Sequence, residues 1–407
     1  MNARRVAELV ARNTYSRLVA YLVAQTGDVE AAEDALGDAF IAALTTWSDN
    51  AVPPNPEAWL LLSAKRKLID EMRRTKTKNK IVHLLEKSEA IANSELEETS
   101  FPDDRLKLLF VCAHPAIDPN IHTPLMLQTV LALNAERIAS AFLISPKAMS
   151  QRLVRAKAKI RDASIAFEIP IAKDLPVRLN AVLQAIYSIY TFGWESIIGG
   201  DPRQTDLAEE AIWLAQLCVQ LMPEEPEARG LLALLLFCES RKNARRSLSG
   251  AYVPLSEQNT DLWSQEVLHM AEAELNHASR FQKLGRFQLE AAIQSAHVQR
   301  LIHKTSNWEA IILLYEGLLQ ISPTLGALVS QAAAIAEAKG FAIGLDALER
   351  IPIDSIKTYQ PYWALKASLL QKMSYPLEAK EPYQRAIGLS EDRAIREFLI
   401  ERSLGNG

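Results

Sequence analysis

A pattern of small and apolar residues recurs at intervals of 34 and 35 residues in the C-terminal part of the chain. Its copies are Val298, Leu301, Ala310, Leu314 and Gly317; Ala332, Ile335, Gly344, Leu348 and Ile351; and Ala367, Leu370, Ala379, Tyr383 and Ala386. Small residues let two helices cross closely, and larger ones fill the layers between helix pairs. Because one such pair cannot bury its apolar face alone, the pattern predicts a stack of helix pairs.

The composition also favours helices. The chain has 407 residues, of which 49% are hydrophobic and only 15 are glycine, and it has few stretches with the alternating pattern of strands. We therefore expect an all-α fold and a chain long enough for two or three domains. The formal net charge of −4 argues against a chain that binds polyanions nonspecifically along its whole length.

The cysteines and apolar segments indicate the compartment. Cys112, Cys218 and Cys238 are odd in number and lie in apolar helical runs, which favours buried thiols in a reducing compartment over disulfides. The apolar run 231–238 is too short to span a bilayer, and no apolar signal segment stands at the N-terminus. We expect a cytoplasmic protein that makes no membrane contact.

A short basic helix is predicted from Ser145 to Arg161. Ser145 suits the N-cap and Pro146 the first helical position. At about 100° per residue, one face is an apolar stripe, made of Met149, Leu153, Ala156 and Ile160. The run also carries positive charge with no acidic residue to offset it: Lys147, Arg152, Arg155, Lys157, Lys159 and Arg161.

An amphipathic helix is also predicted just before it, over residues 134–142. Two helices joined by so short a turn predict a helix-turn-helix, in which the second helix enters the major groove of DNA. A solvated charged helix in a helical protein is the alternative interpretation.

Three helices are predicted near the N-terminus, over residues 4–25, 29–47 and 57–74. The second carries acidic residues on its outer face, and a proline-rich loop, residues 48–56, connects it to the third. The third helix and its extension are basic: Lys65, Arg66, Lys67, Arg73, Arg74, Lys76, Lys78 and Lys80. Trp59 suits a surface that contacts DNA bases, although core packing is the commoner role for Trp59 and for Trp47.

These N-terminal helices resemble the second conserved region of bacterial extracytoplasmic-function sigma factors. The resemblance rests on residues 15–19, Asp28, 32–36, Phe40, Trp47, 56–60, 64–70, Arg73 and Arg74. The predicted helix-turn-helix, about 70 residues further on, resembles that family's fourth region. Two separate motifs in the right order are far more specific than either one alone.

The resemblance implies a subunit of RNA polymerase that has no active site of its own. Core RNA polymerase would bind the acidic helix, through Glu33, Asp34 and Asp38. The minus-ten promoter element would contact the loop 49–55 and the basic helix, through Lys65, Arg66, Lys67, Arg73 and Arg74. The minus-thirty-five element would contact Lys147, Gln151, Arg152 and Arg155.

Two positions depart from the pattern of that family. Gly37 stands where the family usually has glutamine, and Arg66 stands where it usually has asparagine. Both changes leave the helical architecture intact, so they bear on the choice of bases and on the contacts with polymerase.

The repeats resemble tetratricopeptide units, which hold a peptide, a protein or another part of the same chain on a concave surface. We therefore expect a region 2-like domain over 1–76, a linker over 77–101, a region 4-like domain over 102–163, and a tetratricopeptide-like domain over 174–407. The last would regulate the sigma factor in cis, or only stabilise it.

Other classes of function are less well supported. The sequence has no glycine-rich phosphate loop, His-Glu-x-x-His or Gly-x-Ser-x-Gly motif, so we expect neither an enzyme nor a cofactor. His114, Asp118 and His122 are close in sequence, but Pro115 and Pro119 interrupt the helix that a metal site would need. A helix-turn-helix regulator with a peptide-sensing domain is the alternative, and it leaves the acidic helix and the first basic helix unexplained.

Overall fold

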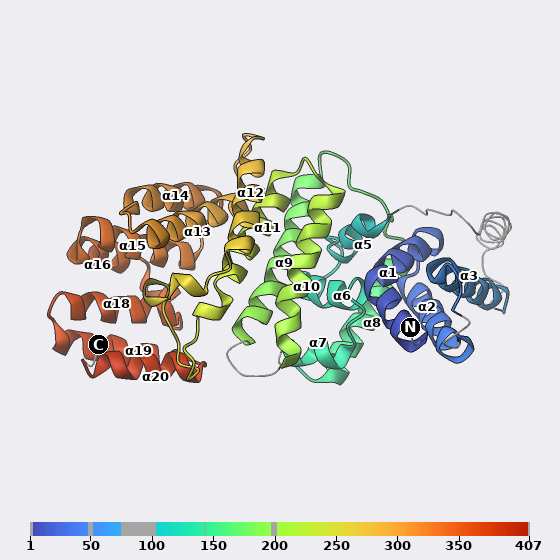
Figure 1. The fold of residues 1–407 in the computed structure, drawn as a ribbon, viewed down its shortest axis with the longest axis horizontal. Coiled ribbons are helices and arrows are strands. Elements are labelled where there is room, and N and C mark those ends of the chain that lie inside the picture. The colour runs from blue at the N-terminus through green and yellow to red at the C-terminus, as the bar shows by residue number, and fades with distance from the viewer. Residues whose placement is uncertain (1–2, 48–51, 75–102, 143, 197–201, 406–407) are drawn as a thin grey trace. The chain divides into compact units, whose positions relative to one another are not determined.

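The computed structural model describes residues 3–47, 52–74, 103–142, 144–196 and 202–405, in two compact units that span 1–192 and 193–407 (Figure 1). The predicted linker 77–101 and residues 49–51 of the predicted promoter loop lie outside the described residues. The described residues form helices, with an isolated bridge between Arg246 and Tyr252, so the predicted all-α fold is confirmed.

The first unit contains two groups of helices. Its elements are α1 (Ala3–Thr26), α2 (Val29–Thr46), α3 (Pro56–Arg74), α5 (Arg105–Cys112), α6 (Pro119–Thr129), α7 (Ala135–Ala141), α8 (Pro146–Asp162) and most of α9 (Leu175–Ser196). Helices α1, α2 and α3 pack on one another, and the two groups meet where α1 contacts α5 and α2 contacts α8.

Local signals fix the turns between these helices. Gly27 has φ +68°, a conformation that glycine adopts without strain, and the Asp28 carboxylate caps α2 by accepting from the Ala31 N–H at 3.2 Å. The core of the first three helices is apolar, with Leu18, Leu22, Leu36, Leu60 and Leu68 at most 1% exposed. These turns and this core fix the directions of α2 and α3.

Helix α9 belongs mainly to the first unit. Its Arg178 guanidinium donates to the Phe110 carbonyl at 2.5 Å, and Val182, Leu183 and Ile186 are buried. The sequence places the start of a C-terminal domain at residue 174, whereas the two units divide within α9, at 192. The hydrogen bond from Arg178 to Phe110 joins the start of α9 to α5, within the first unit.

The second unit is a series of antiparallel helix neighbours. Its elements are α10 (Pro202–Leu221), α11 (Pro226–Ser240), η1 (Lys242–Ala244), η2 (Leu255–Glu257), η3 (Thr260–Leu262), α12 (Gln265–Ser279), α13 (Arg286–His303), α14 (Trp308–Ile321), α15 (Leu325–Lys339), α16 (Phe341–Glu349), α17 (Ile353–Ile356), α18 (Gln360–Lys372), α19 (Pro376–Leu389) and α20 (Arg393–Ser403). The repeat copies fall on contacting pairs: α13 with α14, α15 with α16, and α18 with α19. The predicted helix pairs are therefore present.

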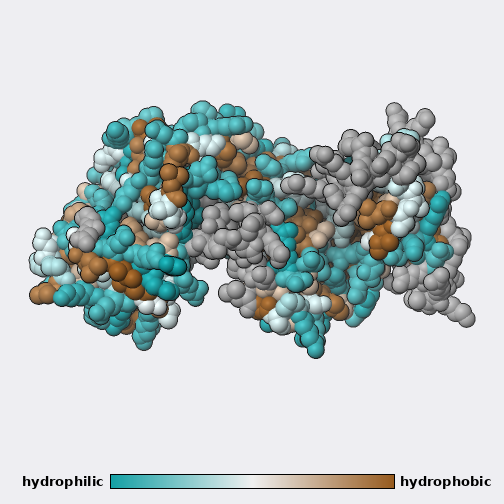
Figure 2. All heavy atoms as spheres, turned by 60° about the horizontal axis from the view of Figure 1, so that its bottom comes forward, coloured by the Kyte–Doolittle hydropathy of each residue, from teal (hydrophilic) through white to brown (hydrophobic). Residues whose placement is uncertain are grey.

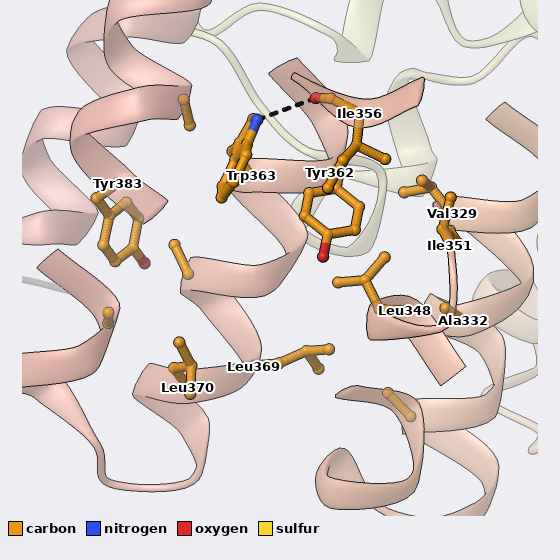
Figure 3. Close-up of a cluster of buried hydrophobic side chains, with 14 of the residues drawn as sticks. Val329, Ala332, Leu348, Ile351, Ile356, Tyr362, Trp363, Leu369, Leu370 and Tyr383 are labelled. Atoms are coloured by element: carbon orange, nitrogen blue, oxygen red, sulfur yellow. Dashed lines mark hydrogen bonds between the residues drawn. The ribbon is translucent and has the colours of Figure 1, made fainter. Parts of the chain in front are cut away.

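One small residue of the repeat stands at a close helix crossing. A Cβ atom added at Gly344 of α16 would overlap Ala336 of α15. The larger residues fill a cluster over α15 to α20, in which Trp363 donates its Nε1–H to the Ile356 carbonyl at 3.1 Å (Figure 3). Leu348, Ile356 and Ala367 in this cluster are fully buried. Each helix pair thus buries its apolar face against the next.

The segment 241–261 is held against the end of the chain. Arg246 forms an ion pair of 2.7 Å with Asp392, the residue that caps α20, and Tyr252 packs edge-on against Phe398 with ring centroids 5.4 Å apart. Such anchoring joins residues more than a hundred positions apart, so the local composition could not predict it.

On the face drawn in Figure 2, hydrophobic side chains form small groups separated by hydrophilic ones. Among the described residues, no helix combines the length and the apolar character that crossing a bilayer requires.

Candidate nucleic-acid interface

Helix α8 has the two faces that its sequence predicts. Ser145 caps it by accepting from the Ala148 N–H at 3.3 Å, and the predicted apolar stripe is buried: Met149, Leu153, Ala156 and Ile160. Lys147, Gln151, Arg152 and Arg155 are all exposed. Positions three and four residues apart share a helix face, so these four side chains form one surface, which we call the reading face.

The reading face keeps its charge uncompensated. Within the described part of the chain, Lys147, Arg152 and Arg155 have no hydrogen bond or ion pair. Unpaired guanidinium and ammonium groups on an exposed helix suit phosphates, and guanidinium can also bind a guanine edge through two hydrogen bonds.

Two cations in the C-terminal half of α8 pair with acids of α2. Lys157 Nζ lies 2.5 Å from Glu33 Oε2, and the two side chains are only 9% and 11% exposed. Arg161 lies 3.4 Å from the Glu30 carboxylate and 3.8 Å from that of Asp28. Sequence reasoning treated Lys157 as one more cation, although its position four residues after Leu153 places it beside the buried stripe.

The three predicted polymerase-binding acids differ in their surroundings. Asp34 is exposed, and Asp38 forms an exposed ion pair of 3.2 Å with Lys67, a kind that contributes little stability. Glu33 is already in an ion pair with Lys157. Burial raises the pKa of the Glu33 carboxyl, and the Lys157 ammonium opposes that rise.

The predicted contacts with the minus-ten element also separate into groups. Arg66 and Lys67 are exposed on α3. Lys65 is only 2% exposed: its Nζ lies 3.2 Å from the Tyr21 hydroxyl and 4.8 Å from the centre of the Tyr21 ring. Its ammonium therefore does not face a DNA phosphate in this structure. The side chains of Arg73 and Arg74, in the last turn of α3, lie outside the described residues.

Position along the helix explains the burial of Lys65. It lies four residues after Leu61 and three before Leu68, which places it on the core face of α3. Trp47 and Trp59 pack edge to face with centroids 5.4 Å apart, and Trp47 is 6% exposed. These contacts support a packing role for the two tryptophans.

The histidines near Pro115 take part in local structure. His122 is buried with Nε2 3.1 Å from the Ile117 carbonyl, and His114 Nδ1 accepts from the Ala116 N–H at 3.1 Å. Burial lowers the pKa of both rings. The described residues contain no group of three side chains placed to ligate a metal ion.

Comparison with known proteins adds the family. The family Sigma-70 region 2 matches residues 10–78, which hold α2, α3 and most of α1. A family of unknown function, DUF6596, matches residues 178–279, from α9 to the end of α12. The "Uncharacterized protein R00370" of Rhizobium meliloti (strain 1021) is 34% identical over 377 residues, which cover 91% of this chain and 89% of that protein. No solved structure matches the chain. The chain therefore belongs to the sigma-70 family of RNA polymerase sigma factors, in a group that includes R00370.

Proposed function

We propose that the protein is a sigma factor of the extracytoplasmic-function type, which joins core RNA polymerase and directs it to promoters. The observation that carries this proposal is the reading face of α8, whose cations have no partner, on the same chain as a Sigma-70 region 2 domain. The helix-turn-helix regulator explains the reading face but not that domain, so we set it aside.

The minus-thirty-five element is assigned to the reading face. A major groove about 12 Å wide admits one helix, and the early residues of that helix reach the base edges. Lys147, Gln151 and Arg155 follow one another at intervals of four along the exposed side of α8.

The minus-ten element is assigned to α3. Arg66 and Lys67 supply exposed positive charge there, and the sequence adds Arg73 and Arg74. Lys65 is left out of this set, because its ammonium is buried against Tyr21.

We assign the polymerase-binding surface to α2, where Asp34 and Asp38 are exposed. Glu33 would become available to polymerase only after it separates from Lys157. The two promoter elements lie about 25 base pairs apart, or roughly 85 Å at 3.4 Å per pair. With both α8 and α3 packed on α2, α8 and α3 cannot reach their two promoter elements together. We infer that binding to polymerase separates α8 from α2.

The helix pairs from α10 to α20 are assigned a regulatory role in cis. They resemble a tetratricopeptide stack, in which a concave surface holds a peptide or a segment of the same chain. Such a domain would take the place of a separate regulatory protein, and a peptide or another protein would be its partner.

Reconstituted run-off transcription tests the proposal. With core polymerase, the full-length chain should start transcripts at defined promoters. Arg155→Ala should lower promoter use by about 5-fold to 150-fold, the equivalent of about 1–3 kcal/mol, and leave polymerase affinity intact. Asp34→Arg should weaken polymerase affinity instead. Start sites indifferent to the protein would refute the proposal.

A further inference from the structure

A cavity of about 770 Å³ lies in the first unit, beside the reading face of α8. Its walls come from the start of α6 with the turn before it, from α8 and the connection that precedes it, and from Ser188 of α9. The volume is in the range of about 300–1,000 Å³ that is typical of small-molecule sites.

One wall of the cavity is cationic. Arg152, Arg155 and Lys159 line it from a single side of α8. Within the described residues, none of the three has a hydrogen bond or ion pair, whereas Lys157 and Arg161 of the same helix pair with acids of α2. Three cations around one cavity with no counter-charge favour an anionic occupant.

The acidic residue in the lining does not neutralise that wall. The carboxylate of Asp118 caps α6, where it accepts from the Asn120 N–H at 2.9 Å and from the Asn120 side-chain amide at 3.1 Å. The Asp118 carboxylate therefore interacts with the start of its own helix, and it forms no ion pair with a residue of α8.

Part of the cavity lining is apolar. Phe142 and Ile144, from the α7–α8 connection, are half-buried, and Met149 and Ile117 lie beneath the surface at 1% and 3% exposed. A bare anion would pair with the cations and leave this apolar part filled with water. A ligand with an anionic head and an apolar body matches both parts of the lining.

We propose that this cavity binds a small amphiphilic anion: a carboxylate, phosphate or sulfonate group on an apolar body. The head group pairs with Arg152, Arg155 and Lys159, and the body packs over Phe142 and Ile144. Because two of these cations belong to the reading face, an occupied cavity withdraws them from promoter DNA. This last step rests on the proposed function; binding of the anion does not.

Dye binding to the full-length chain tests the site without DNA or polymerase. The probe is 8-anilinonaphthalene-1-sulfonate, an aromatic sulfonate that fluoresces when it leaves water. We expect saturable binding to one site. The double variant Arg152→Glu, Arg155→Glu should weaken binding at least tenfold. Ala116→Phe keeps every charge and adds a bulky side chain at an exposed residue of the cavity lining, and it should also weaken binding.

Control variants and competitors separate this site from general adhesion of the dye. Lys173→Glu removes an exposed cation outside the cavity and should leave the affinity unchanged. Thermal unfolding should show that each variant keeps its fold. Decanoate should displace the dye, and neither decanol nor inorganic phosphate should do so at the same concentration. Equal affinity in the parent, the double variant and Ala116→Phe would overturn the site, and displacement by phosphate alone would overturn its amphiphilic ligand.

The regulatory step is tested by run-off transcription in the presence of decanoate. We expect lower promoter use with the parent chain and a smaller effect with Ala116→Phe. If decanoate displaces the dye but leaves transcription unchanged, the regulatory step is wrong and the site stands. If the parent chain supports no promoter-specific start, the proposed function fails, and the dye experiment still decides the site.

Discussion

Lys157 Nζ of α8 lies 2.5 Å from Glu33 Oε2 of α2, an ion pair between residues 124 positions apart. It joins the helix assigned to the minus-thirty-five element to the helix assigned to polymerase. Both side chains are nearly buried, so the pair is protected from the screening by salt that weakens surface ion pairs.

Removing one partner of this pair should destabilise the first unit more than removing both. Lys157→Met leaves the Glu33 carboxylate buried without a cation, which we expect to cost about 3 kcal/mol. Adding Glu33→Gln should restore most of that loss, because no charge then stays buried. Urea unfolding of the full-length variants measures the coupling. Additive single effects would mean that the two side chains do not interact in solution.

A covalent link between α2 and α8 should prevent transcription if the two helices must separate. Glu30→Cys with Arg161→Cys places thiols at side chains whose charged atoms are 3.4 Å apart. A short bismaleimide should join them, and run-off transcripts should fall in proportion to the linked fraction. Chains with one introduced cysteine, treated alike, should stay active.

The native thiols should interfere little with this linkage. Burial raises the pKa of Cys112 and of Cys218 to about 12, so both stay protonated and unreactive near neutral pH. Cys238 is half-buried, so every chain in the linkage experiment also carries Cys238→Ser. Full activity of the linked protein would contradict the need for separation.

Lys65 and Arg66 are adjacent cations for which we predict opposite effects. Lys65→Met loses the contacts with Tyr21 and should lower the free energy of unfolding by about 1 kcal/mol, with little change in promoter melting once the protein is folded. Arg66→Met should impair melting with little change in stability. Urea unfolding and permanganate footprinting of the open promoter measure the two effects. Impaired melting by Lys65→Met at full folding would return Lys65 to the DNA-binding set.

Features that depend on short-range pattern could be predicted from the sequence. The cap and apolar stripe of α8 and the helix pairs of the repeat follow from periodicity and from residue size. The burial of Lys65 could also be predicted, since its spacing from Leu61 and Leu68 marks the core face of α3. Helical position alone would have removed it from the candidate DNA contacts.

Features that depend on tertiary packing could not be predicted. Nothing in the sequence near Lys157 names Glu33 as its partner, and the ion pair of Arg246 with Asp392 joins residues 146 positions apart. The cavity beside α8 likewise needs α6 and α9 in place. A sequence gives the charge of Arg152 and Arg155, and only the fold gives the apolar surface next to them.

His297 should make the second unit sensitive to acid. Burial, with help from the Arg300 and Arg241 charges, lowers the pKa of its ring from 6.5 to about 4. Its Nδ1 is buried without a hydrogen-bond partner, and the ring packs edge-on against Trp308 at 5.7 Å. The neutral ring is therefore the form that the folded chain accommodates.

The sign of the effect follows from proton binding. Between pH 4 and 6.5 the unfolded chain binds more protons at this ring than the folded chain does, so stability falls as the pH falls through that window. At most about 3 kcal/mol is lost, and the contribution is complete above pH 6.5. Urea unfolding of the second-unit transition from pH 4 to 8 measures it. His297→Phe should flatten this part of the profile, whereas His303→Phe, at an exposed ring near the end of the same helix, should not. Identical profiles for the parent chain and His297→Phe would show that another group sets the acid limit.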